Sequence, residues 1–258
     1  MGALDGQHAL VTGGGSGIGA AIATALAAQG AAVTVAGRRR APLESVAARL
    51  PRGLAVTADV TREADCVAMA AAARAAFGPI DIVVANAGAA ESVAVAATDL
   101  AHWQRMLDVN LTGAFLTMKA ALADIIRRDG TRRGTGRIVF IASTAGIKGY
   151  PYVAAYCAAK HGVIGLARSL ALELAPRGVT VNAVCPGFTE TELLDQSLAR
   201  IVAKTGRTHD AARAELARAN PQGRFVTPQE VAETVLWLCT PAAGAITGQA
   251  ISVSGGET

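Results

Sequence analysis

The amino-acid sequence predicts an α/β fold: one doubly wound, mostly parallel sheet of seven strands with helices on both faces. Three observations predict it. Seven short runs rich in Val, Ile and Thr recur along the chain, and Ala-rich stretches of helical character separate them. Most of these runs are apolar on both faces, as strands of a covered parallel sheet are. A Gly-rich segment follows the first run directly. Right-handed crossovers between such strands build a doubly wound sheet.

The elements follow in order from these patterns. Strands are predicted at residues 8–12, 32–36, 54–57, 80–84, 137–141, 179–184 and 250–253. Helices are predicted at residues 17–29, 42–50, 61–77, 100–127, 153–175, 191–204, 209–219 and 227–239.

Helix ends carry their own signals. Gly30 follows the first helix as a left-handed stop, and Pro42 is expected near the first position of the second helix. Thr61 is the expected N-cap of the third. The last helix opens with Thr227-Pro228-Gln229-Glu230, the pattern of a capping box with Pro at its first position.

The chain is expected to be a single domain over residues 1–258. Its 258 residues and 26.1 kDa fit one large α/β unit with a sizeable core. The stretch at about 189–224 departs from the strand–helix rhythm, because it contains two helices and no strand. It is expected to form a helical lid over the substrate.

Composition excludes several classes of protein. The net charge of +4 and an aromatic content of 4% are a weak footprint for a nucleic-acid binder. Charges or glycines interrupt every apolar run well before about 20 residues, so no membrane span is expected. No secretory signal is visible, which favours a cytoplasmic protein with free cysteines at 66, 157, 185 and 239. Cysteine and histidine spacing predicts no metal site.

The Gly-rich segment predicts a site for a dinucleotide. It lies between the first strand and first helix, where glycines let the backbone approach a pyrophosphate and the helix N-terminus offers free N–H groups. A tight turn without ligand is the alternative reading. The candidate cofactor-binding residues in this turn are Gly13, Gly15, Ser16, Gly17, Ile18 and Gly19.

The end of the second strand favours NADP(H) over NAD(H). An acidic residue there would bind the ribose 2′-hydroxyl of NAD, but the sequence has Arg38 and Arg39. A guanidinium pairs well with a 2′-phosphate. Two alternatives stay open: the arginines begin a solvated loop, or they stack on adenine over NAD(H). Asp59, with Val60, is a candidate contact for adenine; the alternative is that its charge lies near the N-terminus of the following helix. Asn86, Ala87 and Gly88 end the fourth strand, where small residues leave room for the adenine ribose.

Tyr156 and Lys160 form the candidate chemical centre. Their spacing of four places them one turn apart on the same helix face. A nearby ammonium stabilises a phenolate, so Lys160 is expected to lower the pKa of Tyr156, which then exchanges a proton with a substrate oxygen. Ser143 follows the fifth strand and is expected to hydrogen-bond that oxygen. Asn110 lies within a predicted helix, where it serves either a local carbonyl or water relay or ordinary packing.

Together these residues resemble the short-chain dehydrogenase/reductase family over essentially the whole chain. The resemblance implies a Rossmann fold, a nicotinamide cofactor and a catalytic tetrad of Asn110, Ser143, Tyr156 and Lys160. Tyr156 and Lys160 would also contact the cofactor. Pro186 and Gly187, with Thr189 and Thr191, match the family segment that touches the nicotinamide carboxamide. The resemblance also implies a homotetramer.

Finer resemblance concerns the substrate. Residues 134–139, 156–163 and 181–188 are similar to 3-oxoacyl-thioester reductases, including polyketide ketoreductases, and residues 223–228 to 3-hydroxybutyrate dehydrogenases. This implies an NADP(H)-dependent reductase of a 3-oxoacyl group on CoA or acyl carrier protein (ACP). The alternatives are an NAD-dependent dehydrogenase of a free 3-hydroxy acid, polyol or steroid alcohol, and a nucleotide-sensing protein without activity. The basic stretch 127–134 is expected at the opposite sheet edge, facing water.

Overall fold

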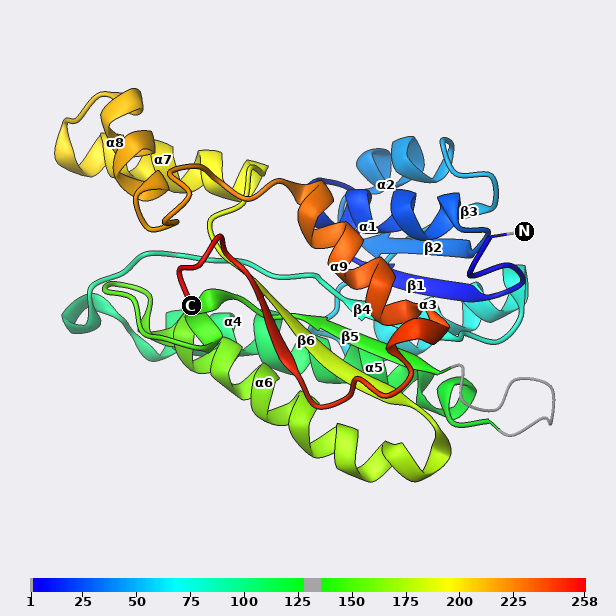
Figure 1. Ribbon diagram of the computed structural model, residues 1–258. Helices are drawn as coiled ribbons and strands as arrows, with labels where there is room; N and C mark the ends of the chain where they lie inside the picture. Colours follow the sequence, from blue (N-terminus) through cyan, green and yellow to red (C-terminus); the bar gives the residue numbers. More distant parts are fainter. Residues whose placement is uncertain (1, 128–135) are drawn as a thin grey trace.

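The computed structural model describes residues 2–127 and 136–258. One parallel sheet of seven strands runs through the molecule in the order β3-β2-β1-β4-β5-β6-β7, so the predicted doubly wound Rossmann arrangement is confirmed (Figure 1). Every strand pair is parallel. The strands are β1 His8–Thr12, β2 Ala32–Gly37, β3 Gly53–Thr57, β4 Ile82–Ala85, β5 Arg137–Ile141, β6 Thr180–Pro186 and β7 Ala250–Val253.

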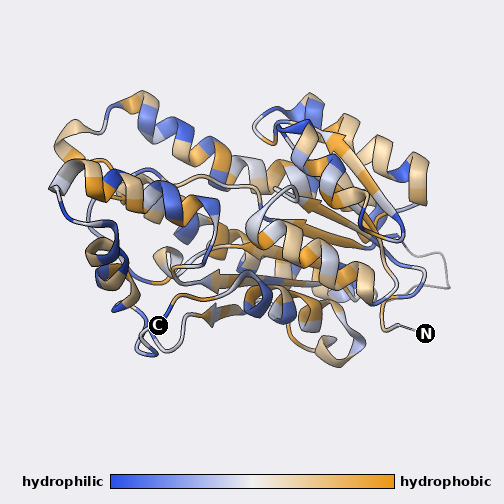
Figure 2. Ribbon diagram, turned by 90° about the horizontal axis from the view of Figure 1, so that it is seen from above, coloured by the Kyte–Doolittle hydropathy of each residue, from blue (hydrophilic) through white to orange (hydrophobic). Residues whose placement is uncertain are grey.

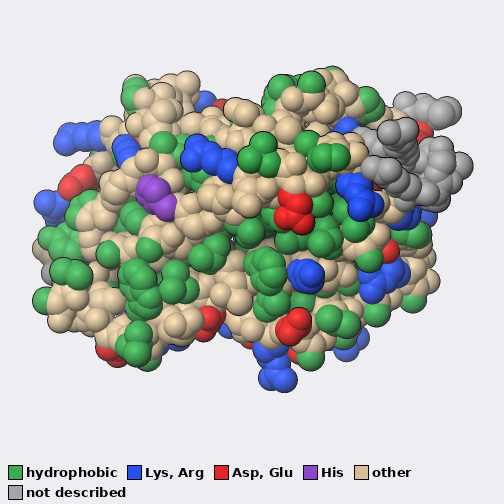
Figure 3. Space-filling model, turned by 90° about the horizontal axis from the view of Figure 1, so that it is seen from below, with side chains coloured by type: hydrophobic (Ala, Val, Ile, Leu, Met, Phe, Trp, Pro, Cys, Tyr) green, Lys and Arg blue, Asp and Glu red, His purple; other side chains and the backbone are tan. Residues whose placement is uncertain are grey.

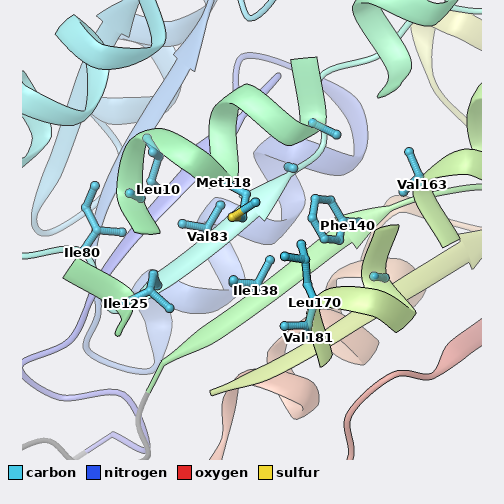
Figure 4. Close-up of a cluster of buried hydrophobic side chains, with 14 of the residues drawn as sticks. Leu10, Ile80, Val83, Met118, Ile125, Ile138, Phe140, Val163, Leu170 and Val181 are labelled. Atoms are coloured by element: carbon cyan, nitrogen blue, oxygen red, sulfur yellow. The ribbon is translucent and has the colours of Figure 1, made fainter. Parts of the chain in front are cut away.

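Helices cover both faces of this sheet. The larger core cluster lies under α3, α5 and α6, with Phe140 of β5 and Met118 among its fully buried members (Figure 4). A second cluster joins α1, α2 and α9 to the other face. The helices are α1 Gly17–Ala28, α2 Arg40–Ala47, α3 Glu63–Phe77, α4 Leu100–Leu107, α5 Gly113–Ile125, α6 Ala154–Leu174, α7 Glu192–Thr205, α8 His209–Ala217 and α9 Pro228–Cys239. The strands between these two helix layers consist largely of hydrophobic residues, which are orange in Figure 2.

Two predicted helix-end signals are confirmed and two are wrong. The Thr227 hydroxyl and the Glu230 carboxylate cap one another's backbone at the start of α9, and Gly30 has the left-handed φ of +92° after α1. Pro42 is the third residue of α2, which begins at Arg40. Thr61 is not a cap, because its hydroxyl donates to Asp59 Oδ1 at 2.8 Å and α3 begins two residues later.

The long helix predicted at 100–127 is interrupted. A π-helical turn, Asp108–Thr112, lies between α4 and α5 and contains Asn110. Such turns insert one extra residue into the helical ladder and redirect the side chains around it. The apolar pattern did not indicate this break, because α4 and α5 bury residues on both sides of it.

The predicted helical insert consists of α7 and α8, which extend beyond one end of the sheet (Figure 1). A bridge between Thr189 and Val226 closes its base, with Val226 N donating to Phe188 O at 2.9 Å. The insert has its own small core, made of Leu194, Leu198, Ala212 and Phe225. Leu194 and Leu198 therefore pack within the insert, whereas Leu193 keeps 38% of its surface exposed.

Candidate active site

The predicted site residues gather at the carboxyl edge of the parallel strands. The Gly-rich turn follows β1, Asn86 follows β4, Ser143 follows β5 and Pro186 ends β6. Because parallel strands end at one edge, residues distant in sequence meet there, at the position where open α/β sheets bind ligands.

The Gly-rich turn has the backbone shape of a phosphate cradle. Gly13 and Gly17 have φ values of +66° and +52°, which side chains disfavour. Ser16 is the N-cap of α1 but its side chain makes no capping hydrogen bond, so the N–H groups of the first turn stay available for an anion. Asn86 Nδ2 holds the turn by donating to Thr12 O at 2.9 Å. This arrangement fits the pyrophosphate of a dinucleotide.

The three residues after β2 differ in their partners. Arg38 has no hydrogen bond or ion pair within residues 2–127 and 136–258. Arg39 Nη2 pairs with Glu192 Oε2 of α7 at 2.9 Å and reaches Ser16 Oγ at 3.4 Å. Arg40 pairs with Glu44 at 2.7 Å on α2. Arg38 is therefore the guanidinium available to a 2′-phosphate, while Arg39 connects the Gly-rich turn to the insert.

Asp59 and Val60 follow β3. The Asp59 carboxylate accepts from Thr61 N at 3.0 Å, and this hydrogen bond is the main reason that the pKa of Asp59 lies below its ordinary value. The charge of Arg38 also lowers it. Asp59 is thus ionised and able to accept a further donor. Val60 is buried against Gly113, where an added Cβ would lie 2.7 Å from Val60 Cγ2.

The structure brings Ser143, Tyr156 and Lys160 together. The Ser143 side chain lies near enough to the Tyr156 hydroxyl to lower the pKa of Tyr156. Lys160 Nζ lies 5.6 Å from the centroid of the Tyr156 ring and donates to Ile141 O at 2.8 Å. The helix spacing and the end of β5 therefore deliver a hydroxyl, a phenol and an ammonium to one place, as the sequence predicted.

The net pKa shift of Tyr156 is opposite in direction to the lowering expected from Lys160 alone. Burial raises the pKa of Tyr156 to about 12, and the nearby Ser143 side chain opposes that rise. Burial also lowers the pKa of Lys160 to about 8. At neutral pH the centre holds a protonated phenol beside an ammonium, which is the state that can donate a proton.

Asn110 joins the centre through the backbone. Its Nδ2 donates to Ala89 O at 2.8 Å and to Met106 O at 3.0 Å, and its Oδ1 accepts from Ala89 N at 3.2 Å. A Cβ added to Gly88 would lie 2.8 Å from Asn110 Oδ1 and 3.6 Å from Lys160 Nζ. Asn110 therefore fixes the segment after β4 beside Lys160, which fits the expected local carbonyl role. Ala87 N donates to Thr12 Oγ1 at 3.3 Å in the same segment.

The segment after β6 approaches the Gly-rich turn from the other side. Gly187 N donates to Val253 O at 3.0 Å, and Thr189 Oγ1 donates to Gly187 O at 2.9 Å. Thr191 is the N-cap of α7, and a Cβ added to Gly17 would lie 3.0 Å from the Thr191 methyl group. The two predicted cofactor segments thus face one another across a narrow gap.

Sequence reasoning missed three residues beside this segment. Glu257, next to the C-terminus, accepts from the Tyr150 hydroxyl and pairs with Lys148 Nζ at 3.1 Å. An added Cβ on Gly187 would lie 3.1 Å from Glu257 Oε2. No local pattern links a residue after the last strand to a loop a hundred residues earlier, so only the folded chain reveals the group.

The structure also tests two further expectations, one about the basic stretch and one about the cysteines. Residues 128–135 of the basic stretch lie outside the described residues. Arg127 pairs with Asp81 at 2.9 Å and does not face water, contrary to the expectation. Arg137, just beyond the basic stretch, is buried with 4% of its surface exposed. The four cysteines are free, as predicted, and burial raises the pKa of Cys66 and Cys185 to about 11.

Replacing Lys160 with Met is expected to stabilise the fold at neutral pH. Burial lowers the lysine pKa to about 8, whereas an unfolded lysine titrates near 10.4, so the buried ammonium costs up to about 3 kcal/mol below pH 8. Between those values the unfolded chain binds more protons, and wild-type stability rises with pH. Urea unfolding of both proteins is expected to show a higher free energy of unfolding for the variant at pH 7, and this difference is expected to disappear by about pH 10.5. A variant less stable than wild type at pH 7 would contradict this.

No helix among the described residues is long and apolar enough to cross a membrane.

Comparisons with known proteins agree with the geometry. Residues 13–258 match the sequence model of a family described as Enoyl-(Acyl carrier protein) reductase. The chain is 40% identical to 2-(S)-hydroxypropyl-CoM dehydrogenase 3 of Xanthobacter autotrophicus, covering 96% of this chain and 95% of the relative. It is also 40% identical to a putative ketoacyl reductase of Streptomyces coelicolor, covering 99% and 98%.

A solved structure, that of a variant actinorhodin polyketide ketoreductase with NADPH, superimposes with a TM-score of 0.91 at 39% identity and covers 97% of each chain. The solved structure shares this fold, and all three proteins are named dehydrogenases or reductases. The chain therefore belongs to the short-chain dehydrogenase/reductase family and is an oxidoreductase of that family.

Proposed function

We propose that this enzyme is an NADP(H)-dependent reductase that transfers a hydride between the nicotinamide and a carbonyl or secondary alcohol. We further propose that its substrate is a 3-oxoacyl thioester carried by CoA or ACP. The observation that carries the reaction type is the placement of Ser143, a protonated Tyr156 and the Lys160 ammonium together at the end of β5 and the start of α6. The relatives named ketoacyl reductases support the substrate class.

The cofactor would lie along the carboxyl edge of the sheet. When bound, it supplies the hydride in reduction and accepts it in oxidation. The residues proposed to hold it are Gly13, Gly15, Ser16, Gly17, Ile18 and Gly19 at the pyrophosphate, Arg38 at the 2′-phosphate with Arg39, paired to Glu192, beside it, Asp59 and Val60 at adenine, Asn86, Ala87 and Gly88 at the adenine ribose, Tyr156 and Lys160 at the nicotinamide ribose, and Pro186, Gly187, Thr189 and Thr191 at the carboxamide.

The side chains of the centre divide the proton chemistry. In reduction the Ser143 hydroxyl hydrogen-bonds the substrate carbonyl oxygen, and Tyr156 donates its phenolic proton to that oxygen as the carbonyl carbon is reduced. The Lys160 ammonium stabilises the phenolate that remains. Asn110 keeps the segment after β4 in place next to Lys160. Oxidation of an alcohol runs through the same atoms in reverse.

Replacing Arg38 with Ala is expected to weaken NADPH binding by a factor of about 10 to 100, because a charge-assisted hydrogen bond contributes about 1.5–3 kcal/mol. NADH affinity is expected to stay within about twofold, since NADH has no 2′-phosphate to lose a contact. Fluorescence titration with both cofactors measures this. Arg40→Ala is the matched control, because Arg40 is already paired with Glu44. Equal affinity of the wild type for NADPH and NADH would overturn the cofactor assignment.

A free 3-hydroxy acid with NAD(H) is the second candidate. It is favoured by the D-beta-hydroxybutyrate dehydrogenase of Cupriavidus necator, which is 38% identical over 98% of this chain. Steady-state rates with acetoacetyl-CoA, acetoacetate and simple ketones, each with NADPH and NADH, separate the two candidates. The thioester proposal expects the highest kcat/KM with acetoacetyl-CoA and NADPH. Preference for acetoacetate and NADH would replace it, and no hydride transfer with any pair would refute both.

We also propose that the enzyme is a cytoplasmic homotetramer and that α7 and α8 form a lid over the substrate. Large apolar side chains stay exposed on α4, α5 and α6, among them Trp103 at 36%, Phe115 at 41% and Leu172 at 82%. Figure 3 looks onto the side where α6 lies and shows hydrophobic side chains gathered there. Burying such a face between copies supports the assembly. Light scattering after gel filtration measures the mass of the assembly, and the mass of four chains is the expected result.

A further inference from the structure

The C-terminal segment after β7 returns to the active-site edge of the sheet (Figure 1). Ser254 fixes this return, since Glu257 N donates to Ser254 O at 3.4 Å and Thr258 N donates to Ser254 Oγ at 3.4 Å. The Glu257 side chain is thereby held inside the protein, where only 2% of it is exposed.

One carboxylate oxygen of Glu257 collects two donors from a single loop. The loop is residues 147–153, which connects the turn after Ser143 to the start of α6. Oε1 accepts from the Tyr150 hydroxyl and pairs with Lys148 Nζ at 3.1 Å. The same Tyr150 hydroxyl contacts Thr144 Oγ1 at 2.7 Å. Glu257 is therefore linked through Tyr150 to the residue next to Ser143.

The other oxygen, Oε2, is buried and has no hydrogen-bond partner among the described residues. It faces Gly187, where an added Cβ would lie 3.1 Å away. A buried acceptor left without a donor costs about 1–3 kcal/mol, so stability alone does not explain a carboxylate here. Burial and the Glu257 hydrogen bond raise the pKa of Tyr150, which keeps its O–H group protonated as the donor to Glu257.

The loop itself needs restraint. Tyr152 has a φ of +67°, in the left-handed region that non-glycine residues rarely adopt. Its carbonyl accepts from Val93 N at 2.7 Å, the only backbone hydrogen bond that joins residues 147–153 to the segment after β4 within the described residues. Ser143 precedes this loop and Tyr156 follows it. The position of Ser143 relative to Tyr156 therefore depends on how firmly the loop is held.

We propose that Glu257 is a positioning residue for the reaction. Its carboxylate fixes Tyr150, and through Tyr150 the loop 147–153, so that Ser143 and Tyr156 keep the positions from which Tyr156 donates its proton to the substrate. Glu257 touches neither of those two residues and acts through Tyr150 and Thr144. This inference depends on the proposed function only for its rate measurements.

Two kinds of measurement test the proposal. Glu257→Ala and Tyr150→Phe are each expected to lower kcat for ketone reduction at least tenfold, with the NADPH dissociation constant within twofold of wild type. Glu257→Gln keeps an acceptor for Tyr150 and is expected to stay within threefold. The double variant Tyr150→Phe/Glu257→Ala is expected to be no slower than Glu257→Ala alone, because both changes break one linkage. Tyr152→Phe is the matched control, expected within threefold, because the Tyr152 residue lies in the same loop and is 66% exposed.

Hydrogen exchange of the cofactor-free variants tests the loop without a substrate. Peptides covering residues 144–153 are expected to exchange at least tenfold faster in Glu257→Ala and Tyr150→Phe than in wild type or Glu257→Gln. Peptides from β1 and β4 are expected to be unchanged. Unchanged exchange in the loop, or additive rate losses in the double variant, would overturn the proposal. A wild type without hydride transfer would refute the proposed function, while the exchange result would still decide the role of Glu257. If Glu257→Ala does not fold, Tyr150→Phe carries both measurements.

Discussion

Replacing Tyr156 with Phe is expected to lower turnover by a factor of about 10³, within the range that general acid–base groups contribute. The substitution removes one oxygen and leaves the aromatic ring in place. Because burial raises the pKa of Tyr156 to about 12, the phenol is protonated throughout the neutral range and is the group that can donate to the substrate oxygen. Ser143, whose hydroxyl is an aliphatic alcohol, is a weaker acid than a phenol and does not replace it.

Single-turnover reduction under saturating NADPH measures this loss at the chemical step. NADPH affinity is expected to stay within about threefold, because the cradle and Arg38 are untouched. Tyr152→Phe is the matched control: the Tyr152 residue is 66% exposed, and its loss of a hydroxyl is expected to leave turnover unchanged. Retained turnover in Tyr156→Phe, or an equal loss in the control, would remove Tyr156 from its proposed role.

The pH dependence of reduction follows from Lys160. Its pKa of about 8 means that the ammonium loses its proton as the pH rises through that value, while Tyr156 stays protonated. The phenolate formed in reduction then lacks its stabilising charge. The upper limb of a rate profile near pH 8 would therefore belong to Lys160 and not to the phenol, contrary to what the tyrosine alone would suggest.

Local patterns predicted the parts of this site that depend on one element at a time. Tyr156 and Lys160 share a helix face because of their spacing, and Ser143 reaches the carboxyl edge because it follows a buried strand. The alternation of strands and helices predicted that the sheet is parallel and that the Gly-rich turn lies at its carboxyl edge. These features need no knowledge of distant contacts.

Features that depend on contacts between distant segments were not predictable in this way. The π-helical turn around Asn110 is accompanied by hydrogen bonds to Ala89, which a helical pattern does not encode. Burial reversed the expected pKa shift of Tyr156, because its magnitude depends on the packing of several elements. Glu257 enters the site from beyond the last strand, where the sequence carries no motif.

Replacing Gly19 with Ala is expected to abolish tight NADPH binding and to destabilise the fold. A Cβ at this position would lie 2.2 Å from Gly13 O and 2.6 Å from Asn86 Nδ2, far closer than non-bonded atoms approach. Gly13 O belongs to backbone, so no side-chain rotation relieves the clash. Either α1 or the Gly-rich turn must move, and the hydrogen bond from Asn86 Nδ2 to Thr12 O is lost or strained with it.

The clash and the displaced turn determine the expected losses of stability and of NADPH affinity. An overpacked buried position typically costs about 1–3 kcal/mol of stability, and a cradle displaced from the pyrophosphate is expected to weaken NADPH binding by a factor of at least about 100. Thermal unfolding and fluorescence titration measure the two losses. Gly37→Ala is the matched control at the end of β2, because its added Cβ would have no neighbour closer than 3.8 Å. If Gly19→Ala binds NADPH as wild type does, the turn is not the pyrophosphate cradle, and the cofactor must be held elsewhere on the sheet edge.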